Sequence, residues 1–156
     1  MSLPQPGQLA PDFELPADNG ETIRLAALRG QTVVLFFYPK ADTPGCIKEV
    51  CSFRDSYTDF QAQNTVVLGL SPDEVKDEAH FKQKFNLPYP LLADSDHAVA
   101  EAYGVWGEKV FMGRNYMGVL RTTFIIDKNG QVARVFENVK PVGHGPAVLQ
   151  ALAEIG

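Results

Sequence analysis

Hydrophobic residues occur along this chain in short continuous runs, separated by longer segments whose apolar side chains recur at helical spacing. Residues 32–38 and 65–70 form two such runs, built almost entirely from β-branched, aliphatic and aromatic residues. Runs of this composition predict strands that are buried on both faces, as in parallel or mixed sheets. Residues 121–126 predict another strand, and residues 131–136 are expected to pair with it after the turn at residues 127–130.

Helices are expected between these strands and at the end of the chain. Residues 43–63 carry apolar side chains at helical spacing, residues 96–103 predict a short helix, and residues 146–155 predict the last one. By contrast, residues 104–119 contain several glycines among scattered aromatic residues, so we expect an irregular excursion there.

The segment after the second buried run carries the signals of a helix start. Ser71 is expected at the N-cap and Pro72 at the first helical position, while Glu74 completes a capping box. We expect this helix to end near Phe85, because two prolines follow it.

Near the start of the chain, residues 13–15 and 22–25 alternate apolar and polar positions around Asp18-Asn19-Gly20, which predicts a hairpin with a long turn. The expected order of elements is therefore β-β-β-α-β-α-α-β-β-α. Strands that alternate with helices favour an α/β fold, and the last hairpin adds an antiparallel edge to the sheet.

Composition places few further limits on the fold. The chain has 156 residues, 45% hydrophobic and 21% charged, which fits one globular domain over residues 1–156. No internal repeat or linker divides it.

Charge and hydropathy exclude two classes of partner. The net charge is −5 and no run of basic residues occurs, which argues against a nucleic-acid partner. No apolar stretch approaches the roughly 18–20 residues of a membrane helix, so we expect no membrane association. The first residues show neither a basic nor an apolar signal region, and we therefore expect a cytoplasmic protein.

The candidate chemistry lies in one short run that contains both cysteines, Cys46 and Cys51. In a cytoplasmic protein, two nearby cysteines are more often catalytic or metal-binding than a structural disulfide. The three histidines are scattered and show no ligand spacing, which disfavours a zinc site.

Position alone indicates that Cys46 is reactive. Thr43 is a good N-cap whose hydroxyl can accept from a first-turn amide, and Pro44 suits the first helical position. Cys46 then falls at the third helical position, where the free amides and the helix dipole favour a thiolate.

The spacing of the two cysteines predicts a conformational change. Residues five apart on a helix are separated by about 7.5 Å of rise and rotated by roughly 140°, beyond the reach of a disulfide. Cys46 and Cys51 therefore bond only if the first turns of the helix unwind. This disfavours chemistry of the Cys-x-x-Cys type and is compatible with a peroxide-reducing cycle, in which a sulfenic acid condenses with a second thiol.

Such a cycle needs a cation or hydrogen-bond donor opposite the thiolate, because negative charge develops on the leaving oxygen. Arg121, at the start of a predicted core strand, is one candidate, and the hydroxyl of Thr43 is another. Arg54 is the nearest alternative, although we interpret it as a structural residue paired with Asp55 or Glu49.

These residues resemble a known family. Pro39-x-x-x-Thr43-x-x-Cys46 resembles the active-site signature of the peroxiredoxins, and residues 37–55 with Cys51 are similar to the bacterioferritin comigratory protein (PrxQ) subfamily. The resemblance extends to Pro11-Asp12-Phe13, to residues 103–109 and to residues 121–127. One departure is Ile47, where many members carry threonine; it is expected to face away from the thiolate.

The resemblance implies a thioredoxin-like three-layer α/β fold, in which helices flank a central mixed β-sheet, with an N-terminal β-hairpin extension. It implies a thiol peroxidase that acts on hydrogen peroxide and organic hydroperoxides, with no metal or organic cofactor. Thioredoxin or a similar dithiol protein would be the reductant, and the protein would be a monomer.

The resemblance also implies roles for individual residues. Cys46 would be the peroxidatic cysteine and Cys51 the resolving one, while Thr43 and Arg121 would orient the peroxide and the thiolate. Pro39 would shield the site.

Two alternatives stay open at this point. A non-enzymatic redox sensor or holdase would use the same oxidation of Cys46 to signal, and a metal-binding module is a distant third. Trp106, Phe111 and Tyr116 are compatible with a substrate or partner surface, with core packing, or with a loop that covers the site.

Overall fold

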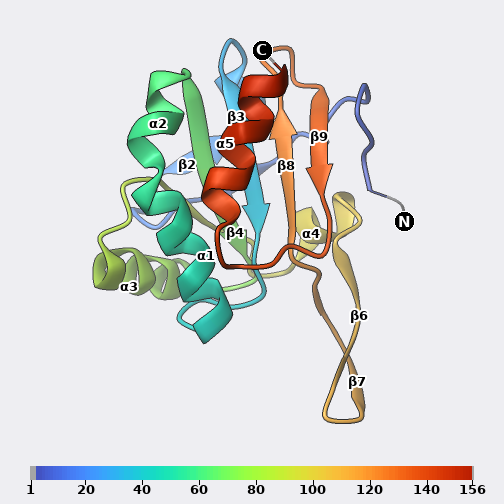
Figure 1. The fold of residues 1–156 in the computed structure, drawn as a ribbon. Helices are drawn as coiled ribbons and strands as arrows, with labels where there is room; N and C mark the ends of the chain where they lie inside the picture. The colour runs from blue at the N-terminus through green and yellow to red at the C-terminus, as the bar shows by residue number, and fades with distance from the viewer. Residues whose placement is uncertain (1–2, 156) are drawn as a thin grey trace.

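A five-stranded mixed sheet forms the centre of the protein in the computed structural model, which describes residues 3–155 (Figure 1). The strand order is β5-β4-β3-β8-β9, in which β3, β4 and β5 are parallel and β8 and β9 are antiparallel to their neighbours. The strands are Thr32–Phe37 (β3), Thr65–Ser71 (β4), Leu91–Ala93 (β5), Thr122–Ile126 (β8) and Val132–Phe136 (β9).

Both faces of this sheet are covered, so the protein has three layers. The helices are Pro44–Asp55 (α1), Tyr57–Ala62 (α2), Val75–Phe85 (α3), Ala98–Ala102 (α4) and His144–Ile155 (α5), with a 3-10 helix at Leu25–Leu28 (η1). One core contains buried residues of α1, α2, α3 and α5, and the other contains those of η1, α4 and the N-terminal segment. No helix among residues 3–155 combines the length and the apolar character that crossing a membrane demands.

Strand β3 shows why the sheet must be covered twice. Val33, Leu35 and Phe37 point into one core, whereas Val34 and Phe36 point into the other. All five side chains are buried, because successive residues of a strand point to opposite faces. The prediction of a strand buried on both faces is confirmed.

The N-terminal hairpin is also confirmed. Glu14–Pro16 (β1) pairs in antiparallel register with Thr22–Arg24 (β2). Asp12, which precedes the hairpin, holds the end of β2 and the start of η1. Its carboxylate accepts a hydrogen bond from the amide of Ala26 at 2.9 Å and pairs with Arg24 at 3.0 Å.

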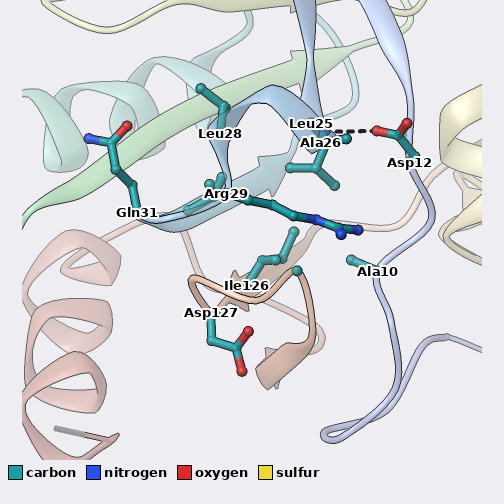
Figure 2. Close-up of a pocket in the computed structure, with 11 residues that line it drawn as sticks. Ala10, Asp12, Leu25, Ala26, Leu28, Arg29, Gln31, Ile126 and Asp127 are labelled. Atoms are coloured by element: carbon teal, nitrogen blue, oxygen red, sulfur yellow. Dashed lines mark hydrogen bonds between the residues drawn. The ribbon is translucent and has the colours of Figure 1, made fainter.

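Figure 2 shows the shallow pocket beside Asp12, which Arg29 crosses and Asp127 borders. It lies at the start of β3, whereas both cysteines follow the end of that strand. The pocket therefore belongs to the end of the sheet opposite the cysteines.

Two helix boundaries differ from the prediction. The expected helix over residues 43–63 is divided at Ser56, whose amide bonds to the Phe53 carbonyl at 3.2 Å and tightens the turn. The expected helix at Ser71 begins instead at Val75, with Glu74 as its N-cap. Ser71 cannot cap this helix, because its backbone completes the pairing of β4 with β5.

The expected irregular excursion over residues 104–119 is wrong. Trp106–Phe111 (β6) and Arg114–Val119 (β7) form a regular antiparallel ribbon that extends away from the sheet (Figure 1). The two residues between them, Met112 and Gly113, both have positive φ, as a tight hairpin turn requires. The sequence does not show the alternation of apolar and polar residues that marks a half-buried strand, because most of the described side chains of the ribbon are exposed on both faces.

Replacing Gly69 with alanine tests the packing of the sheet against the core that contains Phe36 and Leu91. A Cβ at this position in β4 would lie 2.8 Å from side-chain atoms of both Phe36 and Leu91, which are buried. We expect Gly69→Ala to lower the free energy of unfolding by about 1–3 kcal/mol, measured by urea denaturation.

Gly118→Ala in β7 is the matched control. A Cβ there meets only the movable side chains of Lys109 and Tyr116, at 3.2 and 3.4 Å. We expect a change within about 0.5 kcal/mol. Equal effects of the two substitutions would contradict this account of the core.

Candidate active site

The site is built where the chain leaves β3 and enters α1. Pro44 is the first residue of α1, so Cys46 occupies the third helical position, as the sequence predicts. The side chain of Cys46 is completely buried, and neither cysteine forms a disulfide. The sulfur of Cys46 thus lies under the first turn of the helix and not on the surface.

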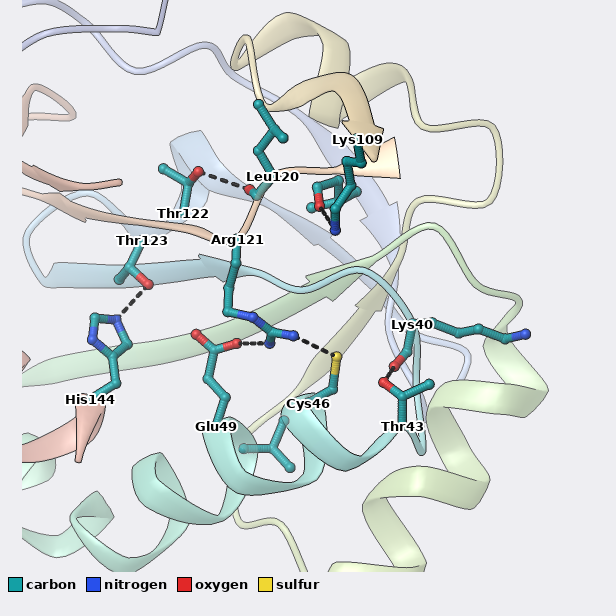
Figure 3. A network of polar contacts seen from close by, with 12 residues as sticks. Lys40, Thr43, Cys46, Glu49, Lys109, Leu120, Arg121, Thr122, Thr123 and His144 are labelled. Carbon is teal, nitrogen blue, oxygen red and sulfur yellow. Dashed lines mark hydrogen bonds and ion pairs between the residues drawn. The ribbon is translucent and has the colours of Figure 1, made fainter. Parts of the chain in front are cut away.

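Arg121 faces this sulfur from the sheet. Its Nη2 lies 3.5 Å from Cys46 Sγ, and its Nη1 donates to Glu49 Oε1 at 2.7 Å (Figure 3). The sheet register explains the placement: Phe37 pairs with Thr122, so Arg121 stands beside the point where the chain leaves β3. Burial disfavours the guanidinium charge, but Cys46 and Glu49 outweigh this effect and raise the pKa of Arg121.

Glu49 is the member of the site that the sequence did not reveal. The sequence suggests Glu49 only as a possible partner of Arg54, yet the side chain is fully buried and pairs with Arg121. Burial raises its pKa to about 7 although Arg121 opposes the shift. Its second oxygen, Oε2, has no hydrogen-bond partner among residues 3–155. The available signal was its position three residues after Cys46, one helical turn away.

Thr43 lies at the N-cap, but its hydroxyl does not act as predicted. It donates to the carbonyl of Lys40 at 2.8 Å and caps no first-turn amide. The backbone carbonyl of Thr43 instead accepts from the amide of Ile47 at 2.8 Å. The hydroxyl therefore stabilises the loop between β3 and α1, which also contains the half-buried Pro39.

The β6–β7 ribbon adds a second cation. Lys109 Nζ donates to the Val119 carbonyl at 3.0 Å. Its pKa is lowered by burial and by the positive charge of Arg121, and Cys46 acts in the opposite direction. Lys109 therefore belongs to the electrostatic surroundings of the sulfur, which the prediction of an irregular segment did not anticipate.

The aromatic residues of the ribbon have different surroundings. Trp106 stacks on His97 with ring centroids 3.8 Å apart, which is packing at the base of the ribbon. Tyr116 is exposed. The side chain of Phe111 lies outside the described part of the structure.

His144 also lies near the site. Its Nε2 lies 2.8 Å from Thr123 Oγ1, and its ring stands edge-on to Phe53 and Phe136. Burial, with a contribution from Arg121, lowers the pKa of His144 to about 4. The imidazole is therefore neutral at physiological pH. Among the described residues, no group of three or more His, Cys, Asp or Glu side chains is arranged to hold a metal ion.

Cys51 is partly exposed, further along the same helix, and burial raises its pKa. The helix around it is held by three contacts to other parts of the fold. Tyr89 donates its hydroxyl to the Val50 carbonyl at 2.6 Å, and the Gly145 amide donates to Ser52 Oγ at 2.8 Å. Arg54 donates to the Phe85 carbonyl at 2.8 Å and pairs with Asp55, so it is a structural residue as expected.

Comparisons with known proteins agree with this geometry. Residues 6–135 match the AhpC/TSA family. The chain is 46% identical over 149 residues to peroxiredoxin Bcp of Bacillus subtilis, covering 96% of this chain and 95% of the relative. It is 43% identical over 148 residues to peroxiredoxin Bcp of Escherichia coli, covering 95% of each.

Solved structures show the same fold. A mutant of PrxQ from Xylella fastidiosa superposes with a TM-score of 0.93 at 30% identity, covering 99% of this chain and 98% of the other. The bacterioferritin comigratory protein of Xanthomonas campestris gives 0.87 at 35% identity, covering 92% of each chain. The expected thioredoxin-like α/β fold is confirmed.

A thiol at a helix start thus lies against a guanidinium from the residue just before β8, and the curated relatives match nearly the whole chain. The chain therefore belongs to the AhpC/TSA family and, within it, to the Bcp/PrxQ peroxiredoxins, which are thiol peroxidases.

Proposed function

We propose that this protein reduces hydrogen peroxide and organic hydroperoxides with Cys46 as the peroxidatic cysteine and Cys51 as the resolving cysteine. The observation that carries the proposal is the Arg121 guanidinium, which joins Cys46 Sγ to the buried carboxylate of Glu49. The structure of the Xanthomonas campestris relative is described in terms of alkyl peroxide reduction, which supports this substrate class.

In the first step, the Cys46 thiolate attacks one peroxide oxygen and the O–O bond breaks. The sulfur is oxidised to sulfenic acid, and the second oxygen leaves with the bonding electron pair and takes up a proton as water or an alcohol. Arg121 is placed to stabilise the charge that develops on the oxygens, because its position is fixed before reaction by the pair with Glu49. Thr43 and Pro39 would orient and shield the peroxide.

In the second step, the Cys51 thiol attacks the sulfenic sulfur, and a disulfide and water form. This needs local unwinding of α1, because the two residues stand five apart on an intact helix. The bonds from Tyr89 to Val50 and from Gly145 to Ser52 hold the segment that must unwind. Their strength would therefore set how readily the second step follows the first.

In the third step, an external dithiol protein of the thioredoxin type reduces the disulfide by exchange and becomes oxidised itself. Recycling of this kind needs a reducing compartment, so we propose that the protein works in the cytoplasm. We propose a monomer, because both cysteines of the cycle lie on one helix of one chain.

Substitution of each cysteine separates the two roles. Cys46→Ser is expected to abolish peroxide consumption, because no thiolate remains in the first turn. Cys51→Ser is expected to consume about one equivalent per chain and then stop in the presence of thioredoxin and its reductase, because a sulfenic acid accumulates. For both variants, the measurements are the peroxide consumed per chain and the NADPH oxidised through the reductase and thioredoxin.

The same assay tests the alternative of a redox sensor. An enzyme reduces many equivalents of peroxide per chain with excess reductant, whereas a sensor reduces about one. Undiminished activity in Cys46→Ser would refute the proposal.

Removal of the guanidinium tests the role of Arg121. Arg121→Met alone would leave the Glu49 carboxylate buried and unpaired, so we combine it with Glu49→Gln. We expect the second-order rate of Cys46 oxidation to fall about 10²–10³-fold relative to Glu49→Gln alone, as for loss of a fixed donor to a developing oxyanion.

Arg134→Met is the control, because this exposed arginine pairs with Glu154 on the surface and is expected to leave the rate unchanged. Stopped-flow oxidation by hydrogen peroxide measures each rate. A double variant as fast as Glu49→Gln would exclude Arg121 from the chemistry.

Removal of the Tyr89 hydroxyl tests the unwinding step. Tyr89→Phe loses one buried hydrogen bond to α1, so we expect the unwound form to be favoured about three- to tenfold. Disulfide formation should then compete better with over-oxidation, which lowers the fraction of sulfinic Cys46 found by mass spectrometry at high peroxide.

Tyr103→Phe is the matched control, because this hydroxyl donates to the Pro11 carbonyl at 2.7 Å in the other core. It is expected to leave the sulfinic fraction at the wild-type value. An equal change in both variants would indicate a general loss of stability and would contradict a specific role of Tyr89.

A further inference from the structure

The loop between β3 and α1 is anchored on its far side by a buried row of polar side chains. The amide of Ala41 in this loop donates to Asp73 Oδ2 at 2.8 Å. Ser71 Oγ lies 2.7 Å from the same oxygen and also contacts Glu78 Oε1. Tyr38, at the end of β3, donates to Glu78 Oε2 at 2.7 Å. The row therefore begins and ends in the segment that leads to Cys46.

The hydrogen atoms in this row can be counted. Three pairs of residues are in contact through side-chain oxygens: Tyr38 with Glu78, Glu78 with Ser71, and Ser71 with Asp73. The two hydroxyl groups supply only two hydrogen atoms, since each hydroxyl has a single one to donate. The third contact is a hydrogen bond only if one of the carboxyl groups is protonated.

Of the two carboxyl groups, Glu78 is the one whose surroundings favour the protonated form. This side chain is fully buried, whereas Asp73 is partly exposed and accepts the Ala41 amide. Burial disfavours a carboxylate more strongly at the less exposed position. The row then runs in one direction: Tyr38 donates to Glu78, Glu78 to Ser71, and Ser71 to Asp73.

We propose that protonated Glu78 is a positioning residue for the peroxide site, which holds Asp73 on the amide of Ala41 and thereby fixes the loop over Cys46. The proposal rests on the role of Cys46 proposed above. Glu78 touches neither the sulfur nor the peroxide; it acts through Ser71 and Asp73 on the loop that contains Pro39 and Thr43.

The charges around Glu78 give this anchor a pH limit. Asp73 faces it from the β4–α3 segment and Asp18 from the β1–β2 turn, where Asp18 pairs with Lys82 at 3.2 Å. Burial, with these two negative charges, raises the pKa of Glu78 to about 8, although its hydrogen bonds oppose the shift. The pKa of Tyr38 is also raised by burial, so its hydroxyl keeps its proton.

Above this pH, two carboxylates would compete for the single hydrogen of Ser71. The link to Asp73 weakens, and the loop then depends more on its surface tether, in which Lys84 pairs with Asp42 at 3.0 Å. A loosened loop positions the peroxide less well. The rate of Cys46 oxidation should therefore fall relative to a variant whose anchor cannot ionise.

Glu78→Gln is that variant, because an amide donates to Ser71 and accepts from Tyr38 at every pH. The measurement is the second-order rate of Cys46 oxidation by hydrogen peroxide between pH 6 and 9.5, as the ratio of wild type to variant. Effects of pH that do not depend on residue 78 are common to both proteins and cancel in this ratio. We expect a ratio near one at pH 6 that falls at least threefold by pH 9.5.

Glu78→Leu removes the anchor at all pH values, so its rate should be lowered at pH 6 as well and its deficit should not deepen with pH. Glu154→Gln, an exposed position on α5, is the control and should give a constant ratio of one. A ratio for Glu78→Gln that stays constant from pH 6 to 9.5 would overturn the proposal.

A readout independent of peroxide separates this proposal from the function on which it rests. Amide hydrogen exchange at Ala41, measured by NMR, should lose protection above pH 8 in the wild type relative to Glu78→Gln. Wild type that consumes no peroxide but shows this difference would refute the proposed function alone. Equal protection of Ala41 in both proteins at pH 9.5 would overturn the anchor.

Discussion

The site depends on one buried ion pair, between Arg121 and Glu49. Glu49 is completely buried on α1, where an unpaired carboxylate would be strongly unfavourable, and Arg121 reaches it from the sheet at 2.7 Å. Loss of one partner from a buried pair typically costs about 3–5 kcal/mol, so the pair holds α1 to β8 in one position. The pair thereby directs the other terminal nitrogen of Arg121, Nη2, at Cys46 Sγ. Arg121 thus holds α1 through Glu49 and also provides the cation of the proposed chemistry.

In the proposed cycle, helix α1 would have to meet two opposed requirements. Its first turn would have to be ordered to place Cys46 beneath free backbone amides, yet its middle would have to unwind for Cys51 to reach the oxidised sulfur. The contacts of α1 bear on both requirements. The pair with Arg121 holds Glu49, which lies between the two cysteines, and single hydrogen bonds from Tyr89 and Gly145 hold Val50 and Ser52. The break at Ser56 separates α2 from α1, so unwinding of one helix leaves the hydrogen bonds of the other intact.

Sequence reasoning succeeded where a local pattern determines the structure. The buried strands followed from continuous apolar runs, and the helix position of Cys46 followed from Thr43 at the N-cap and Pro44 at the first helical position, although the Thr43 hydroxyl caps no amide. It failed where long-range pairing decides. Ser71 resembles an N-cap, but its backbone completes the sheet. In the sequence, Glu49 resembles a surface residue of a helix. Its partner, Arg121, lies 72 residues further along the chain, just before β8.

The β6–β7 ribbon shows a second kind of limit. Most of its described side chains are exposed on both faces, so no alternation of apolar and polar residues marks it as a strand pair. Its contribution to the site, Lys109, is found only through the electrostatic coupling with Arg121 and Cys46. Charged residues that interact from distant parts of the chain show no regular spacing in the sequence. Residues that share one face of a helix do, because they recur every three or four positions.

The anchoring of the active-site loop limits where the conformational change can occur. Ala41 and Asp42 are both bonded to the side of the fold that contains α3, so the chain before α1 is fixed. At its other end α1 stops at Ser56, beside a buried core. In the proposed cycle, the residues between these two points would absorb the movement that brings Cys46 and Cys51, separated by about 7.5 Å of helical rise, within reach of a disulfide. Because Glu49 lies between the two cysteines, this movement would also act on its pair with Arg121, while the loop before α1 stays attached to Asp73.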